Sequence, residues 1–183
     1  TKAPFVWTWD RPTAGTASFT ARLLGVSGTL ATSAPAPVTI APSYGSGQLM
    51  CEWWTGVGGR RILQGTTANG YPDRPQRQEP VSRFSSRDRG DSYLERLRGF
   101  VVPPATGVYQ FWITGDDECE LWLSEDETQA RLRRIAIMAV ITGKWGVSPE
   151  EWELNQGQCS APVALTQGKR YYVEALHKAG GED

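Results

Sequence analysis

Two adjacent carboxylates, Asp116 and Asp117, interrupt an apolar and aromatic-rich stretch of the 183-residue chain. The flanking runs, Val108–Thr114 and Glu118–Ser124, have the length and composition of strands, so they predict a hairpin with a tight Gly-Asp connection. Paired carboxylates at such a connection are costly unless a cation joins them, and Ca²⁺ prefers oxygen ligands. The residues alone leave two interpretations open, which are a calcium site and a solvated acidic turn.

The aspartate pair belongs to a longer pattern that runs from about Cys51 to the end of the chain. The pieces CEWWTGVGG, GDSYLERLRGFVVPPATGVYQFWITGDDECELWLS and SAPVALTQGKRYYVEALHKAGGED follow one another in that order. Together they resemble the sugar-binding β-barrel module of bacterial protective antigen, the PA-fourteen domain. The resemblance implies a calcium-binding loop that carries Asp116 and Asp117, often joined by a cis peptide bond. It also places Asp183 where the family often has an aspartate on a second metal-binding loop.

Composition and turn signals divide the chain into three segments. Residues 1–41 contain three strand-like runs about ten residues apart, which suits an antiparallel sandwich. Their pattern resembles the last strands of a bacterial Ig-like domain, so we expect an incomplete and poorly packed segment. Residues 42–48 are a polar, Gly- and Ser-containing linker. Residues 49–183 are the PA-fourteen-type module, which the resemblance predicts to be truncated at its end.

The module is predicted to be all-β, an antiparallel β-barrel or sandwich of the lectin-like kind with little helix. A further strand is expected at LMCEWWT. A short helix is expected to begin at Ser148 and end near Asn155. The irregular stretch Gly56–Ser92 predicts a long functional loop, with Tyr71 near its middle as a sugar-binding residue. The other expected strands are Leu94–Val102, Leu132–Val140, Ala161–Leu165 and Arg170–His177.

Several function classes are disfavoured by composition. A net charge of −1 predicts no nucleic-acid partner, and no apolar run approaches the ~20 residues that a membrane span needs. Three cysteines cannot all pair internally, and no Cys/His spacing indicates zinc. His177 is the single histidine and is expected to be structural. A glycosidase pair remains open among the carboxylates of this region, which are Glu118, Glu120, Glu125 and Asp126.

The resulting hypothesis is a non-catalytic, calcium-dependent carbohydrate-binding module of a larger extracellular or cell-surface bacterial protein. Its predicted metal ligands are Asp116, Asp117 and Asp183, and its predicted glycan-binding residues are Asp116, Asp117 and Tyr71. Because the chain begins at Thr1 and not at Met, we expect it to be cut from a longer precursor with neighbouring domains. The alternatives are a structural spacer without a ligand and an accessory domain of a glycoside hydrolase.

Overall fold

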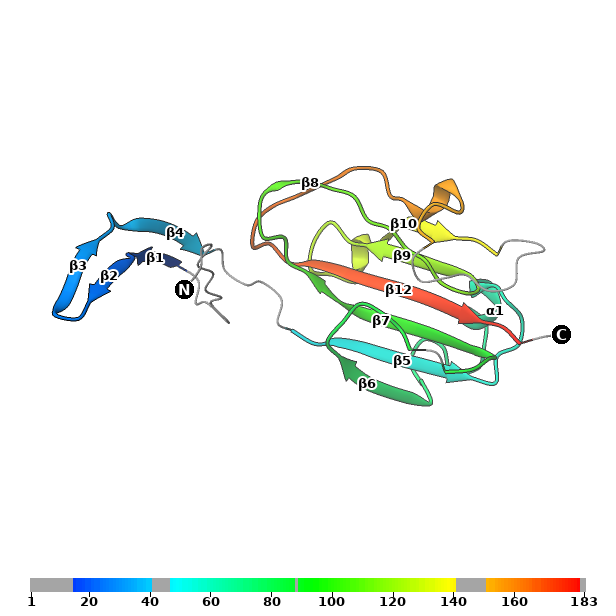
Figure 1. Cartoon of the computed structure of the whole chain (residues 1–183). Coiled ribbons are helices and arrows are strands. Elements are labelled where there is room, and N and C mark those ends of the chain that lie inside the picture. The colour runs from blue at the N-terminus through cyan, green and yellow to red at the C-terminus, as the bar shows by residue number, and fades with distance from the viewer. Residues whose placement is uncertain (1–14, 41–46, 88, 141–150, 182–183) are drawn as a thin grey trace. The chain divides into compact units, whose positions relative to one another are not determined.

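A computed structural model describes residues 15–40, 47–87, 89–140 and 151–181 (Figure 1). Contacts divide the chain into two compact units, Thr1–Tyr44 and Gly45–Asp183. The division falls within the predicted linker at 42–48. That the first unit ends an Ig-like domain stays a prediction.

The first unit is built from two pairs of antiparallel strands. Strand β1 (Gly15–Phe19) pairs with β4 (Ala36–Ile40), and β2 (Arg22–Gly25) pairs with β3 (Gly28–Thr32) around a two-residue turn. Apolar side chains on β2 and β3 remain in solvent, since Leu23, Leu24 and Leu30 are 62%, 68% and 65% exposed. The described strands of this unit therefore bury little apolar surface. The first predicted run, residues 5–9, lies outside the described residues.

The second unit centres on a six-stranded antiparallel sheet with the order β10-β9-β12-β7-β5-β6. A two-stranded sheet of β8 (Gly107–Tyr109) and β11 (Val163–Leu165) faces it. Within the described residues β10 and β6 are free edges, so the strands form a sandwich arrangement and not a closed barrel. The large sheet consists of β5 (Leu49–Thr55), β6 (Arg77–Val81), β7 (Tyr93–Val101), β9 (Cys119–Leu123), β10 (Arg133–Met138) and β12 (Tyr171–Ala179).

Helical structure is scarce, as the sequence predicts. Among the described residues it consists of α1 (Ile62–Thr66) and two short 3-10 turns, η1 (Gln129–Arg131) and η2 (Gln156–Gln158). The all-β prediction is therefore confirmed. No helix among the described residues has the length and apolar character needed to cross a bilayer.

Alternation along the strands gives the large sheet two different faces, because successive side chains on a strand point to opposite sides. One face carries the main core, in which Leu121, Leu123 and Val173 pack beneath Ile113 and Leu165. The opposite face carries a smaller apolar cluster under α1. Its buried members are Trp54, Val57, Ile62, Leu94 and Leu176.

The predicted hairpin of 108–114 and 118–124 is wrong. Strand β8 pairs with β11 in the small sheet, while β9 pairs with β12 and β10 in the large one. The chain therefore crosses from one layer to the other at the aspartate pair. The expected side-chain directions do hold, since Tyr109, Phe111 and Ile113 all pack on the main core.

Two further predictions need correction. The stretch Gly56–Ser92 is not one irregular loop, because it contains α1 and β6 and lies partly under the sheet. The helix expected from Ser148 begins outside the described residues, and its described end, 151–155, is not helical.

Candidate functional site

The aspartate pair lies where β9 begins, beside the end of β12. The Asp117 N–H donates to the Lys178 carbonyl at 3.0 Å, and the Lys178 N–H donates to the Glu118 carbonyl at 2.9 Å. The peptide bond between Asp116 and Asp117 is cis, as the family resemblance implies. Asp116 is exposed, whereas Asp117 is 8% exposed. The two neighbours therefore present one carboxylate to solvent and one to the protein interior.

The buried carboxylate of Asp117 is held from two sides. Arg60 Nε donates to Oδ1 at 2.6 Å, and the Gly180 N–H donates to Oδ2 at 2.7 Å. Arg60 and Gly180 therefore meet on one side chain, although they lie 57 and 63 positions from Asp117 in the sequence. A charged donor shortens and strengthens such hydrogen bonds. Asp117 consequently joins the segment before α1 to the end of β12.

His177 supports the loop from the sheet, so the structural role predicted for it agrees with the geometry. Its Nε2–H donates to the Asp116 carbonyl at 2.7 Å, and its ring packs edge-on against Tyr93. Its other nitrogen lies 3.9 Å from Glu95 Oε2. Burial raises the pKa of Glu95, but the neighbouring His177 and hydrogen bonds from Cys51 and Ser86 outweigh it and hold that pKa below its usual value. The loop backbone is therefore anchored to an ionised, buried carboxylate.

Gly180 is required by this packing. A Cβ at this position would lie 2.6 Å from Arg60 Cγ and 2.8 Å from Asp117 Oδ2. We expect Gly180→Ala to lower the free energy of unfolding by about 1–3 kcal/mol, because overpacking forces neighbouring atoms apart. Urea denaturation measures this. Gly58→Ala is the matched control, since its Cβ would meet nothing within 4 Å; equal losses in both variants would contradict the assignment.

A cation at the aspartate pair is compatible with the donor set. Two neighbouring carboxylates supply the oxygen ligands that calcium prefers, and the Arg60 guanidinium already occupies a cation position at Asp117. Gly180 lets the backbone approach that carboxylate closely, since a Cβ there would lie 2.8 Å from Oδ2. Among the described residues, no group of three or more His, Cys, Asp or Glu side chains is arranged so that it could hold a metal ion. Calcium would thus be held by Asp116 and Asp117 with backbone or water oxygens, and it would have to displace Arg60 from Oδ1.

The predicted site residues do not all come together. Asp183 lies outside the described residues. Tyr71 packs edge-on against Trp54, with ring centroids 5.0 Å apart, and lines a separate pocket on the α1 side of the large sheet. Neither Asp116 nor Asp117 lines that pocket. Glu118 connects the two places, because its Oε2 accepts a 2.6 Å hydrogen bond from the Ile62 N–H at the start of α1.

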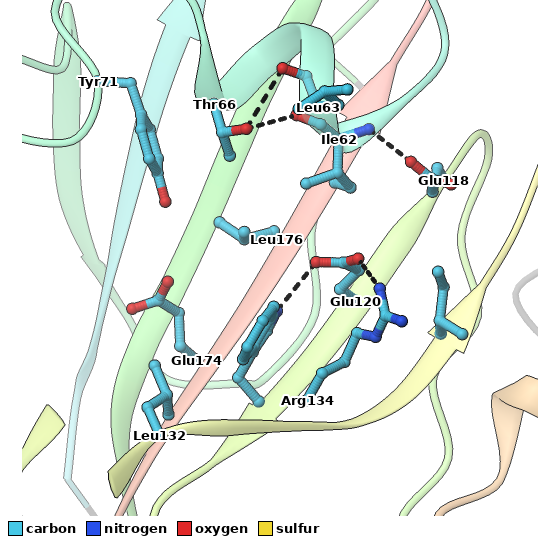
Figure 2. Close-up of a pocket in the computed structure, with 12 residues that line it drawn as sticks. Ile62, Leu63, Thr66, Tyr71, Glu118, Glu120, Leu132, Arg134, Glu174 and Leu176 are labelled. Carbon is cyan, nitrogen blue, oxygen red and sulfur yellow. Dashed lines mark hydrogen bonds and ion pairs between the residues drawn. The ribbon is translucent and has the colours of Figure 1, made fainter. Parts of the chain in front are cut away.

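The pocket has a volume of about 440 Å³ and is walled by α1, β9, β10 and β12 (Figure 2). Its polar wall includes Glu120, which accepts from Arg134 Nη1 at 2.5 Å and from Trp122 Nε1 at 3.0 Å. Glu174 also faces it and is 7% exposed. Sequence reasoning missed Arg60, Glu174 and Gly180. Glu174 is a charged residue within the otherwise apolar run YYVEAL, and this was the available signal.

Cys51, which lies beside Glu95, does not have the properties of a catalytic nucleophile. Cys51 is buried, and its Sγ donates to Glu95 Oε1 at 2.6 Å. Burial first, and then the adjacent Glu95 carboxylate, raises the pKa of this thiol well above its usual value. A thiol with a raised pKa is a poor nucleophile at neutral pH, since the thiolate is the reactive form.

Comparison with known proteins finds similarity to short segments of long animal proteins. No family model matches the chain, and no solved structure matches it significantly. A mouse N-acetyl-beta-glucosaminyl-glycoprotein 4-beta-N-acetylgalactosaminyltransferase 1 is 32% identical over 108 residues, which are 59% of this chain and 10% of that protein. Dog fibrocystin is 31% identical over 140 residues, or 75% of this chain and 3% of that protein. Mouse fibrocystin-L is 33% identical over 87 residues, or 47% of this chain and 2% of that protein.

The chain therefore spans a tenth or less of the length of these relatives. In each of them the matching segment is a small part of a much longer polypeptide. By its name, the first is a glycosyltransferase that acts on glycoproteins.

Proposed function

We propose that the second unit, Gly45–Asp183, is a non-catalytic carbohydrate-binding module of the PA-fourteen type within a larger extracellular protein. The observation that carries this proposal is the aspartate pair, in which exposed Asp116 adjoins buried Asp117 at the end of the large sheet. Calcium bound there would offer open coordination positions to sugar hydroxyls. The chain's own contribution is to fix the two carboxylates through Gly180, Lys178 and His177.

Similarity to a segment of a transferase whose name specifies a glycoprotein supports a glycan as the ligand. The support concerns ligand class alone, because the matched segment is one tenth of that protein.

Catalysis is not part of the proposal. The carboxylates of Glu120 and Glu174 line one pocket, but both oxygens of Glu120 are already engaged by Arg134 and Trp122. A general base or nucleophile must be directed at the substrate, whereas the two oxygens of Glu120 are directed at Arg134 and Trp122. We expect the full chain to release no aryl leaving group from a panel of aryl glycosides. Hydrolysis that disappears in Glu120→Gln would overturn the non-catalytic assignment.

Glycan binding is expected to be weak and to depend on calcium. One shallow site of this kind gives a dissociation constant of order millimolar, roughly −4 kcal/mol, which repeated modules on a surface would strengthen by avidity. The test is a glycan array probed with the full chain in calcium and in EDTA, followed by NMR titration of the best sugar. Asp116→Asn should abolish the calcium-dependent binding, whereas Asp73→Asn, which changes another exposed aspartate, should not.

Two outcomes would contradict the proposal. Binding that is unchanged by EDTA and by Asp116→Asn would reject the calcium-bridged mechanism. Absence of binding to every glycan on the array would favour a structural spacer instead.

A further inference from the structure

The pocket on the α1 side of the large sheet holds a carboxylate that the aspartate pair does not explain. Glu174 lies on β12 with only 7% of its surface exposed, and it faces the pocket. Figure 2 shows its carboxylate directed into the space below Tyr71. One oxygen accepts a hydrogen bond from the Tyr172 hydroxyl at 3.0 Å. No hydrogen bond to the other oxygen is found among the described residues; it is not one of the fully buried atoms without a partner, and Glu174 lines the pocket.

Burial of this carboxyl is costly in the absence of a ligand. Desolvation raises the pKa of Glu174, and the nearby guanidinium of Arg96 offsets only part of it. That guanidinium is itself committed to Glu52, to which Arg96 Nε donates at 2.7 Å. A buried polar group without sufficient partners destabilises a fold. Because Glu174 lines the pocket, its second oxygen can accept a hydrogen bond from a hydroxyl or N–H group of a ligand there.

The remaining walls fit a sugar. Tyr71 and Trp122 contribute aromatic surface, and Leu176 contributes an apolar floor between them. Arg134 is 46% exposed and uses one nitrogen on Glu120, so further N–H groups remain available to a ligand. Three carboxylates and one guanidinium line the pocket, from Glu118, Glu120, Glu174 and Arg134, so it is rich in hydrogen-bond acceptors. A ligand with several hydroxyl donors and an apolar ring face matches this mixture. A volume of about 440 Å³ lies within the range of small-molecule sites.

We infer that this pocket is a second sugar-binding site, in which Glu174 hydrogen-bonds a hydroxyl and Tyr71 and Trp122 contact the ring. The inference rests on the proposed function in taking a sugar as the ligand. It does not use the calcium-bridged binding proposed for the aspartate pair. Neither Asp116 nor Asp117 lines the pocket. Binding here is therefore independent of calcium, which separates this site from the aspartate loop.

The test is an NMR titration of the ¹⁵N-labelled full chain in EDTA with methyl glycosides of N-acetylgalactosamine, N-acetylglucosamine, galactose and glucose. The indole N–H signal of Trp122, assigned with Trp122→Phe, reports on the pocket because that group lines it. We expect at least one glycoside to shift this signal. Glu174→Gln should weaken that binding at least tenfold, and the matched change Glu127→Gln at an exposed position should leave it unchanged.

Glu174→Gln also keeps the side-chain shape and removes a desolvated charge, so its thermal melting temperature should equal or exceed that of the parent chain. Tyr71→Phe, which retains the ring, provides a second variant and should weaken binding less than Glu174→Gln. Glycoside binding that requires calcium and leaves the Trp122 signal unmoved would overturn this inference while sustaining the proposed function. A shift that persists in Glu174→Gln would overturn it as well.

Discussion

Glu52→Gln is expected to lower the free energy of unfolding by about 3–5 kcal/mol, since it removes the shared anion of two arginines. Glu52 lies on β5 with its side chain 3% exposed. Its Oε2 accepts from Arg96 Nε at 2.7 Å and from Arg98 Nε at 2.9 Å, and its Oε1 accepts from Arg98 Nη2 at 2.8 Å. With an amide in its place, the buried guanidinium of Arg96 loses the charged acceptor of its hydrogen bond. Urea denaturation at neutral pH measures the loss.

The same site predicts a pH dependence. Burial raises the pKa of Glu52, but hydrogen bonds and charge attraction from Arg98 and Arg96 outweigh it and hold the pKa below the usual 4.5. A carboxyl whose folded-state pKa is lowered stabilises the fold fully above its unfolded value, and this contribution is lost as the pH falls through the folded-state pKa. The difference in stability between parent and Glu52→Gln should therefore narrow below pH 4.5.

Glu79→Gln is the control for this prediction. Glu79 also accepts from two arginines, Arg87 and Arg89, but its side chain is 37% exposed, so solvent replaces the lost contacts. Its effect on unfolding should be small. A loss in Glu52→Gln no larger than that in Glu79→Gln would show that the buried arrangement contributes little.

Arg60→Gln is expected to strengthen calcium binding to the aspartate pair by about tenfold or more. Arg60 Nε lies 2.6 Å from Asp117 Oδ1, so the guanidinium and a metal ion compete for the same oxygen. Removing a positive charge a few Å away lowers the cost of placing a divalent ion there; at an intermediate dielectric this effect is on the order of 1–4 kcal/mol. Isothermal titration of calcium into the full chain, with thermal melting as a second readout, measures the change.

Arg61→Gln is the matched control, because it removes the same charge at the adjacent, exposed position. It should change calcium affinity far less than Arg60→Gln. Asp117→Asn should abolish the calcium response in the parent and in the Arg60→Gln background. A calcium affinity that is indifferent to Arg60→Gln would contradict competition at Asp117 and would place any metal elsewhere.

Local sequence determined the individual strands and the residues that flank the aspartate pair. The predicted strands at LMCEWWT and Leu94–Val102 match β5 and β7 to within a residue. Alternation also assigned Leu121 and Leu123 to one face correctly. These features follow from side-chain periodicity, which is a property of neighbouring residues.

Tertiary structure decided which strands pair and what surrounds the aspartates. The runs on either side of Gly115 read as a hairpin, yet they belong to different layers, because non-local pairing with β11 and β12 fixes their place. Arg60 reaches Asp117 across 57 positions, which no local pattern indicates. Glu174 likewise becomes notable only once α1 and β10 wall a pocket in front of it. The sequence pointed to Asp116 and Asp117 as candidate ligand-binding residues. The guanidinium of Arg60, which competes with a metal ion for Asp117, and the second pocket both follow from contacts between segments far apart in the chain.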